Sequence, residues 1–169
     1  MSDGFPASAV DTSGGSPFPE GCEVRSVRLD DAGQLAELET EARDALVDAR
    51  GGASLLEEQP AVGDWVALMP LPEMHTWVAV IDGVVVGYLV LRHAAGDPTG
   101  IVDQVYVQPE AREIGFGDVM LAAAICCIRD GGGMRVESFA LPGDRDTKNL
   151  YERAGVTARK IIVSKRIDG

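Results

Sequence analysis

Hydrophobic positions along the chain follow two spacings, one typical of helices and one typical of strands. Apolar residues recur every three or four positions over residues 35–49, which predicts an amphipathic helix that ends at Gly51-Gly52. We expect Asp30 or Asp31 to cap the start of this helix, and residues 23–27 to form the strand before it.

The middle of the chain is rich in strand-forming residues. Residues 76–81 and 84–92 are separated by Asp82-Gly83, which favours a two-residue turn and predicts an antiparallel hairpin. The other predicted elements are a helical excursion at 53–74, strands at 101–107, 134–141 and 160–167, and helices at 118–130 and 146–154. The order is therefore β-α-(α)-β-β-β-α-β-α-β, without an internal repeat.

Length and charge limit the classes of function. A chain of 169 residues is most simply one domain that buries a core without metal ions or disulfides. Its 15 basic and 27 acidic residues give a net charge of −12, which opposes binding to nucleic acid and suits a cationic partner. Acidity that serves only solubility explains the same count, and the sequence leaves both interpretations open.

The cysteine content and the N-terminal sequence indicate the cellular compartment in which the protein is expected. Cys22, Cys126 and Cys127 cannot all pair internally and lack the paired spacing of a metal site, so we expect reduced thiols, a cytoplasmic protein and no metal. Neither a signal peptide nor an apolar run of about 18 residues occurs, so no membrane partner is expected. Residues 1–22, rich in Ser, Gly and Pro, are predicted to be a flexible tail before a domain at 23–169.

One local feature indicates a ligand. Residues 105–107 form an apolar strand that ends at Pro109, and Gly115 and Gly117 let the backbone turn with its N–H groups directed outward. Free N–H groups and the dipole at the start of the following helix attract a diphosphate. A plain strand-to-helix turn explains the same glycines, so a second motif has to decide.

Two motifs occur in register in the second half of the chain. The first, (Gln/Arg)-x-x-Gly-x-(Gly/Ala), is present as Arg112, Gly115 and Gly117 and is preceded by Val107-Gln108-Pro109. The second, Leu-Tyr-Glu-(basic)-x-Gly, is present as residues 150–155, about 35 residues later. Both motifs and their interval resemble those of the GNAT family, which transfers an acetyl group from acetyl-CoA to an amine. The resemblance implies an α/β (α+β) single domain whose mixed central sheet splays between the fourth and fifth strands, with helices on both faces.

The resemblance also implies where acetyl-CoA binds. The pantetheine arm would lie in the splayed gap, paired with the backbone of residues 105–107, and the diphosphate would sit on the amides of residues 113–118. The implied cofactor-binding residues are Val105, Tyr106, Val107, Arg112, Glu113, Ile114, Gly115, Phe116, Gly117, Asp118, Asp144 and Asn149.

Two residues are candidates for the chemistry. Tyr151 of the second motif is the expected proton donor to the departing CoA thiolate, although a tyrosine that only packs is the alternative. Asp103 is the candidate general base because residues 103, 105 and 107 share one face of the strand. A carboxylate that only attracts a cation is the alternative for Asp103.

Two departures from the family pattern leave a second function open. Glu113 and Asp118 put carboxylates beside the expected diphosphate, unless Asp118 caps free amides of the helix. The first hypothesis is an acetyl-CoA-dependent N-acetyltransferase that acts on a primary amine, either a small molecule or a lysine, and a cationic one suits the charge. The second is a GNAT-fold binding module that holds CoA without transfer or acts through protein contacts. Both hypotheses are compatible with a homodimer.

Overall fold

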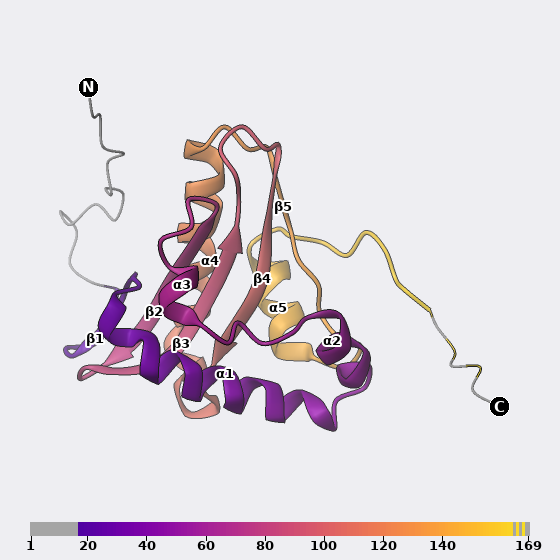
Figure 1. The fold of residues 1–169 in the computed structure, drawn as a ribbon, viewed down its shortest axis with the longest axis horizontal. Helices are drawn as coiled ribbons and strands as arrows, with labels where there is room; N and C mark the ends of the chain where they lie inside the picture. Colours follow the sequence, from indigo (N-terminus) through magenta and orange to yellow (C-terminus); the bar gives the residue numbers. More distant parts are fainter. Residues whose placement is uncertain (1–16, 164, 166, 168–169) are drawn as a thin grey trace.

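The fold is a five-stranded mixed sheet covered by helices on both faces (Figure 1). The computed structural model describes residues 17–163, 165 and 167. The strands are β1 (Cys22–Ser26), β2 (Met74–Ile81), β3 (Val84–Arg92), β4 (Thr99–Val107) and β5 (Arg135–Glu137), and they lie side by side in this order. The first four pair antiparallel, whereas β4 and β5 pair parallel. The mixed sheet predicted from the resemblance is confirmed.

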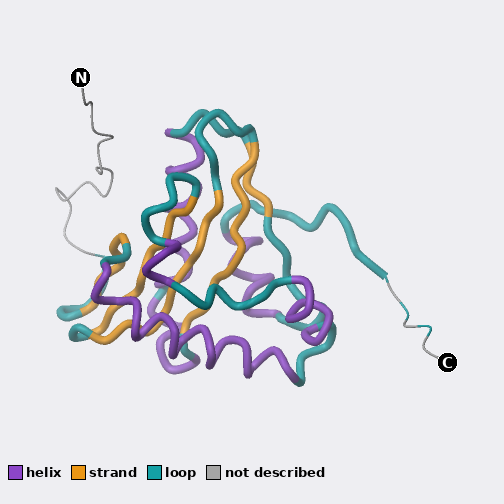
Figure 2. Tube along the Cα trace, in the orientation of Figure 1, coloured by secondary structure: helices purple, strands orange, loops and turns teal. Residues whose placement is uncertain are grey.

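The helices divide between the two faces of the sheet (Figure 2). One face carries α1 (Ala32–Val47) and α3 (Trp65–Leu68), and α2 (Gly52–Glu58) extends this layer past the sheet. The other face carries α4 (Phe116–Asp130) and α5 (Arg145–Arg153). Two 3-10 turns, η1 (Leu29–Asp31) and η2 (Pro109–Ile114), precede α1 and α4.

Alternating side chains of β3 supply both cores. Leu89 and Leu91 pack under α4, whereas Tyr88 and Val90 pack under α1. Because successive side chains of a strand point to opposite faces, a strand covered on both sides reads as a continuous apolar run. The hairpin before β3 turns at Asp82 and Gly83, whose φ angles of 48° and 83° are those of a two-residue turn with both central residues left-handed.

The sheet opens between β4 and β5. Their pairing covers only Thr99↔Arg135, Gly100↔Val136 and Ile101↔Glu137, and the chain after Glu137 is no longer a strand. At Gly100 the side chain of Ile128 fills the place of a Cβ, so α4 lies close against this end of the sheet. The predicted splay between the fourth and fifth strands is confirmed.

Two predicted strands differ from the structure. The strand expected at 134–141 ends at Glu137, because the next residues have moved away from β4 and lack a pairing partner. The final strand expected at 160–167 is wrong for residues 160–163, 165 and 167, which are exposed and do not belong to the sheet. Residues 164 and 166 are not among the described residues. Alternation predicts a strand, but only a neighbouring strand makes one.

Most of the predicted N-terminal tail, residues 1–16, lies outside the described residues. Phe18, near the end of that tail, packs against Phe116, with 4.9 Å between the two ring centroids. No helix within the described part of the chain has the length and apolarity that crossing a bilayer requires.

Asp31 anchors the start of α1 in an unexpected way. It stands at the N-cap position but makes no side-chain bond to the helix. Its carboxylate instead accepts two hydrogen bonds from Arg25, at 2.7 and 2.8 Å, and one from the backbone N–H of Arg28 at 2.7 Å. The hydrogen bonds from Arg25 hold the pKa of Asp31 below its usual range. The predicted cap is corrected: Asp31 ties β1 to η1.

Replacing Asp31 with Asn should therefore destabilise the protein in a pH-dependent way. A buried ion pair that loses one partner costs about 3 kcal/mol or more, so we expect a loss of that order in the free energy of unfolding at pH 7. Because the folded pKa of Asp31 is lowered, the difference between wild type and variant is present at neutral pH and shrinks as pH falls below about 4. Urea unfolding at pH 7 and pH 3 measures it, and a difference that stays constant across this range would contradict the assignment.

Candidate functional site

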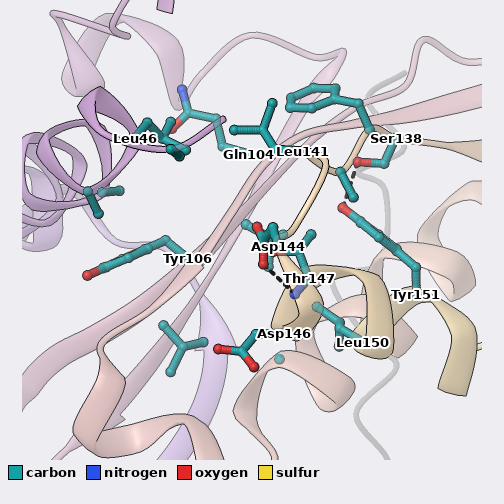
Figure 3. Close-up of a pocket in the computed structure, with 18 of the residues that line it drawn as sticks. Leu46, Gln104, Tyr106, Ser138, Leu141, Asp144, Asp146, Thr147, Leu150 and Tyr151 are labelled. Atoms are coloured by element: carbon teal, nitrogen blue, oxygen red, sulfur yellow. Dashed lines mark hydrogen bonds between the residues drawn. The ribbon is translucent and has the colours of Figure 1, made fainter. Parts of the chain in front are cut away.

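A pocket of about 990 Å³ occupies the opening between β4 and β5 (Figure 3). Its walls come from six parts of the chain: the second half of α1, α2, Tyr88 of β3, β4, the turn that leads into α4, and the chain from 138 through α5. The pocket therefore exists because the sheet opens, and every predicted motif contributes to its lining.

The exposed edge of β4 forms the long wall. Residues 103–107 line the pocket. Residues 104–107 pair with β3 on one side, while β5 has already diverged on the other. The Val107 carbonyl at the end of this edge accepts a hydrogen bond from Arg112 Nε at 3.0 Å. Such an unpaired strand edge is suited to an extended amide-containing ligand. The structure thus brings Val105, Tyr106 and Val107 together in the lining, as the resemblance implied.

The glycine turn forms one end of the pocket. Gly115, with φ of 92°, is the residue before α4 and has the left-handed backbone that favours glycine. Gly117 lies in the first turn of α4, where an added Cβ would meet only the Leu150 side chain at an ordinary 3.4 Å. Neither backbone strain nor crowding requires a glycine at 117, and the open space belongs to the pocket beside the helix N-terminus. This end therefore fits a diphosphate.

Two ion pairs join this turn to α5. Arg112 Nη1 lies 2.9 Å from Asp146, and Arg153 donates to both oxygens of Asp118 at 2.8 and 2.9 Å. Asp118 therefore does not cap α4, because its carboxylate is turned to Arg153 and neutralised there. Glu113 lines the pocket with an exposed side chain.

Two other residues of the first motif face the interior. Phe116 is fully buried and Ile114 packs against the same core, so their side chains do not line the pocket. Only their main chain could meet a ligand.

Asp144 lies at the N-terminus of α5, and Asn149 lies within this helix. Asp144 precedes this helix and accepts a hydrogen bond from the Thr147 N–H at 3.0 Å, which is an N-cap contact. Asn149 is exposed at the rim of the pocket. The structure brings both residues to the pocket, and it shows a structural task for Asp144.

Tyr151 lies at the point where β4 and β5 separate. Its side chain is buried, with 6% of the residue exposed, and its hydroxyl is 2.6 Å from Ser138 Oγ (Figure 3). Burial raises the pKa of Tyr151 to about 12. The phenol is therefore protonated at neutral pH, as a proton donor must be.

Asp103 lies on the same strand edge but is not a free carboxylate. Arg92 on β3 donates to both of its oxygens at 3.0 Å. The hydrogen bonds that Arg92 donates to Asp103 raise the pKa of Arg92. Both oxygens of this carboxylate are therefore already engaged by a guanidinium.

A polar network between α1 and β4 was missed from the sequence. Glu39 is 4% exposed, and its Oε1 accepts from Gln104 Nε2 at 3.0 Å and from the Val62 N–H at 2.9 Å. The Tyr88 hydroxyl donates to Gln104 Oε1 at 2.9 Å, and burial raises the pKa of Tyr88. A signal existed: Glu39 stands on the apolar face of its helix, four positions after Leu35. The network fixes one wall of the pocket.

Near the mouth of the pocket, Tyr106 also links β4 to α1. Its hydroxyl donates to Glu41 at 2.7 Å, and burial together with this hydrogen bond raises the pKa of Tyr106 to about 12.

Within the described residues, no group of three or more His, Cys, Asp or Glu side chains is placed to hold a metal ion.

Comparison with known proteins identifies the family. A family model described as an acetyltransferase (GNAT) domain matches residues 72–157, which are 86 of the 169 residues. No protein with a curated description matches the sequence significantly.

Solved structures share the fold at low identity. An aminoglycoside acetyltransferase from an uncultured soil metagenomic sample, in complex with trehalose, has a TM-score of 0.65 at 16% identity over 88% of this chain and 96% of its own. The protein AAC(6')-Iy, in complex with the bisubstrate analog CoA-S-monomethyl-acetylneamine, has a TM-score of 0.61 at 15% identity over 88% of this chain and 99% of its own. A ribosomal-protein-alanine N-acetyltransferase from Brucella melitensis biovar Abortus 2308 has a TM-score of 0.60 at 18% identity over 86% of this chain and 99% of its own. With its two motifs, its splayed sheet and the matching family model, the chain belongs to the GNAT family of acetyl-CoA-dependent N-acetyltransferases.

Proposed function

We propose that this protein transfers the acetyl group of acetyl-CoA to the nitrogen of a primary amine by direct attack, with Tyr151 as the general acid. In this reaction a C–N bond forms, the C–S bond breaks, and the thiolate takes a proton. The observation that carries the proposal is a buried, protonated phenol at the separation of β4 and β5, inside a pocket whose other end suits a diphosphate. The thioester of acetyl-CoA and its diphosphate lie at opposite ends of the pantetheine arm, so the two ends of the pocket suit the two tasks.

The ion pairs around the turn support binding of acetyl-CoA by this chain. Asp118 is neutralised by Arg153, and the Arg112 guanidinium lies beside the turn. One of the two carboxylates that favoured a binding module without transfer is therefore no longer an obstacle. The buried phenol favours an enzyme over such a module.

We propose that Asp103 shapes the acceptor end rather than acting as the base. Its oxygens are both held by Arg92, and its side chain lines the pocket next to Gln104. The nitrogen would then lose its proton to water. A cationic amine suits the acidic chain, and the fold neighbours include proteins described as aminoglycoside and ribosomal-protein-alanine acetyltransferases. The candidate acceptors are thus an amine on a cationic small molecule and a lysine.

Replacing Tyr151 with Phe tests the general acid. Removing a general acid lowers turnover by about 100-fold or more, so we expect kcat to fall by this factor while the thermal shift caused by acetyl-CoA is unchanged. Free-thiol release from acetyl-CoA, with spermidine, kanamycin and a lysine peptide as acceptors, provides the assay. Wild-type turnover in this variant would remove Tyr151 from the mechanism.

Replacing Asp103 with Asn separates the two roles of this carboxylate. We expect kcat to change by less than about threefold and KM for a cationic amine to rise, because only ground-state attraction is lost. Glu137→Gln is the control, since it removes one exposed carboxylate outside the pocket. A fall in kcat of about 100-fold for Asp103→Asn alone would assign it the role of base.

Replacing Gly117 with Glu tests the diphosphate end. The new side chain would enter the open space and add negative charge, so we expect the thermal stabilisation by acetyl-CoA to disappear while the unliganded protein stays folded. Gly33→Glu is the matched control, because Gly33 occupies the same position in the first turn of α1, has no neighbour within 4 Å and lies outside the pocket. An unchanged acetyl-CoA shift in the Gly117 variant would contradict the assignment.

A further inference from the structure

The hydroxyl of Ser138 joins two elements that the sheet no longer connects. Ser138 follows β5 directly, and its Oγ lies 2.9 Å from the Val102 carbonyl oxygen of β4. The same Oγ lies 2.6 Å from the Tyr151 hydroxyl of α5 (Figure 3). Val102 is fully buried and is the first residue of β4 after the paired stretch. Ser138 therefore lies where the strand pairing stops and the pocket begins.

Counting protons fixes the direction of both hydrogen bonds. A carbonyl oxygen only accepts, so the single proton of the Ser138 hydroxyl is donated to Val102. The Ser138 oxygen must then accept from Tyr151, whose phenolic proton lies on the 2.6 Å line between them. The chain of donors runs from Tyr151 to Ser138 to Val102.

We propose that Ser138 is a positioning residue that holds the Tyr151 phenol before acetyl transfer and stabilises its phenolate afterwards by reorienting one hydroxyl. This inference rests on the proposed role of Tyr151 as the general acid. When the C–S bond breaks, the Tyr151 proton goes to the CoA sulfur, and the phenolate oxygen keeps the electron pair. The Ser138 O–H then rotates from Val102 to the phenolate, and its own proton never leaves its oxygen. Water reprotonates the phenolate at the end of the cycle.

The observed geometry requires only a rotation of this hydroxyl. Hydrogen bonds from a hydroxyl to an anionic oxygen are about 2.5–2.7 Å long, and the 2.6 Å separation of the two oxygens is already in this range. The Val102 carbonyl would lose its bond from Ser138 only while the phenolate exists. A neutral hydrogen bond is thus exchanged for a stronger one at the step that creates the charge, which is where stabilisation speeds a reaction.

Ser138→Ala and Ser138→Thr in the wild-type protein, together with Ser138→Ala in the Tyr151→Phe variant, test this role. A hydrogen bond to a charged group, formed only as charge develops, corresponds to a change of about 10- to 100-fold in rate. We expect Ser138→Ala to lower kcat by this factor with KM for acetyl-CoA unchanged, and Ser138→Thr, which keeps the hydroxyl, to recover most of the loss. In a Tyr151→Phe background Ser138→Ala should change kcat less than about twofold, since the group that it serves is gone. Thiol release from acetyl-CoA is measured with the best acceptor of the three amines, or with water if none raises the rate.

The outcomes separate this inference from the proposed function. Slow turnover in Tyr151→Phe with full turnover in Ser138→Ala would overturn the role of Ser138 alone, whereas full turnover in Tyr151→Phe would overturn the general acid itself. An equal loss from Ser138→Ala in both backgrounds, or a loss matched by a fall in Tm and in acetyl-CoA binding, would give Ser138 only a structural role and overturn the inference.

Discussion

The end of the pairing between β4 and β5 is the constraint on which the site depends. Had the two strands stayed paired beyond Ile101↔Glu137, the edge of β4 would be occupied and the pocket would be closed. Strands that diverge leave backbone groups without partners, and buried groups of this kind must be satisfied by something else. Ser138 satisfies the first of them, at Val102, and the rest of the edge is available to a ligand that offers amides.

Charge pairing around the pocket joins the two sequence motifs into one unit. Arg153 of the second motif neutralises Asp118 after the glycine turn, and Arg112 of the first motif pairs with Asp146 on α5. These contacts lie at the surface, where an ion pair contributes little to stability, so their importance is local. They turn the Asp118 carboxylate toward α5, the helix that carries Tyr151, and bring Arg112 of the turn beside Asp146 of the same helix.

The sequence predicted what depends on neighbours along the chain. The hairpin at Asp82-Gly83, the helices and the glycine turn follow from local preferences, and all of them are present. The final strand failed because alternation says nothing about whether a partner strand is at hand. Ser138 was missed for the same kind of reason, since its two contacts join residues that lie 36 and 13 positions away. Tyr151 became the candidate general acid only because a motif marked it, not because any local pattern did.

The acceptor end differs from the acetyl-CoA end in what forms it. The turn and β4 offer main-chain groups, which change little with sequence, whereas the wall next to Asp103, where we propose that the acceptor binds, is formed by side chains of the network of Glu39, Gln104 and Tyr88. Gln104 uses its N–H on Glu39 and accepts at its oxygen from Tyr88, so its orientation is set from both sides. A single substitution at Glu39 would free this amide and change which groups the pocket offers to an amine. With the acceptor placed as proposed, the buried carboxylate of Glu39 decides which atoms of Gln104 face the amine, so acceptor preference depends on a residue that does not itself line the pocket.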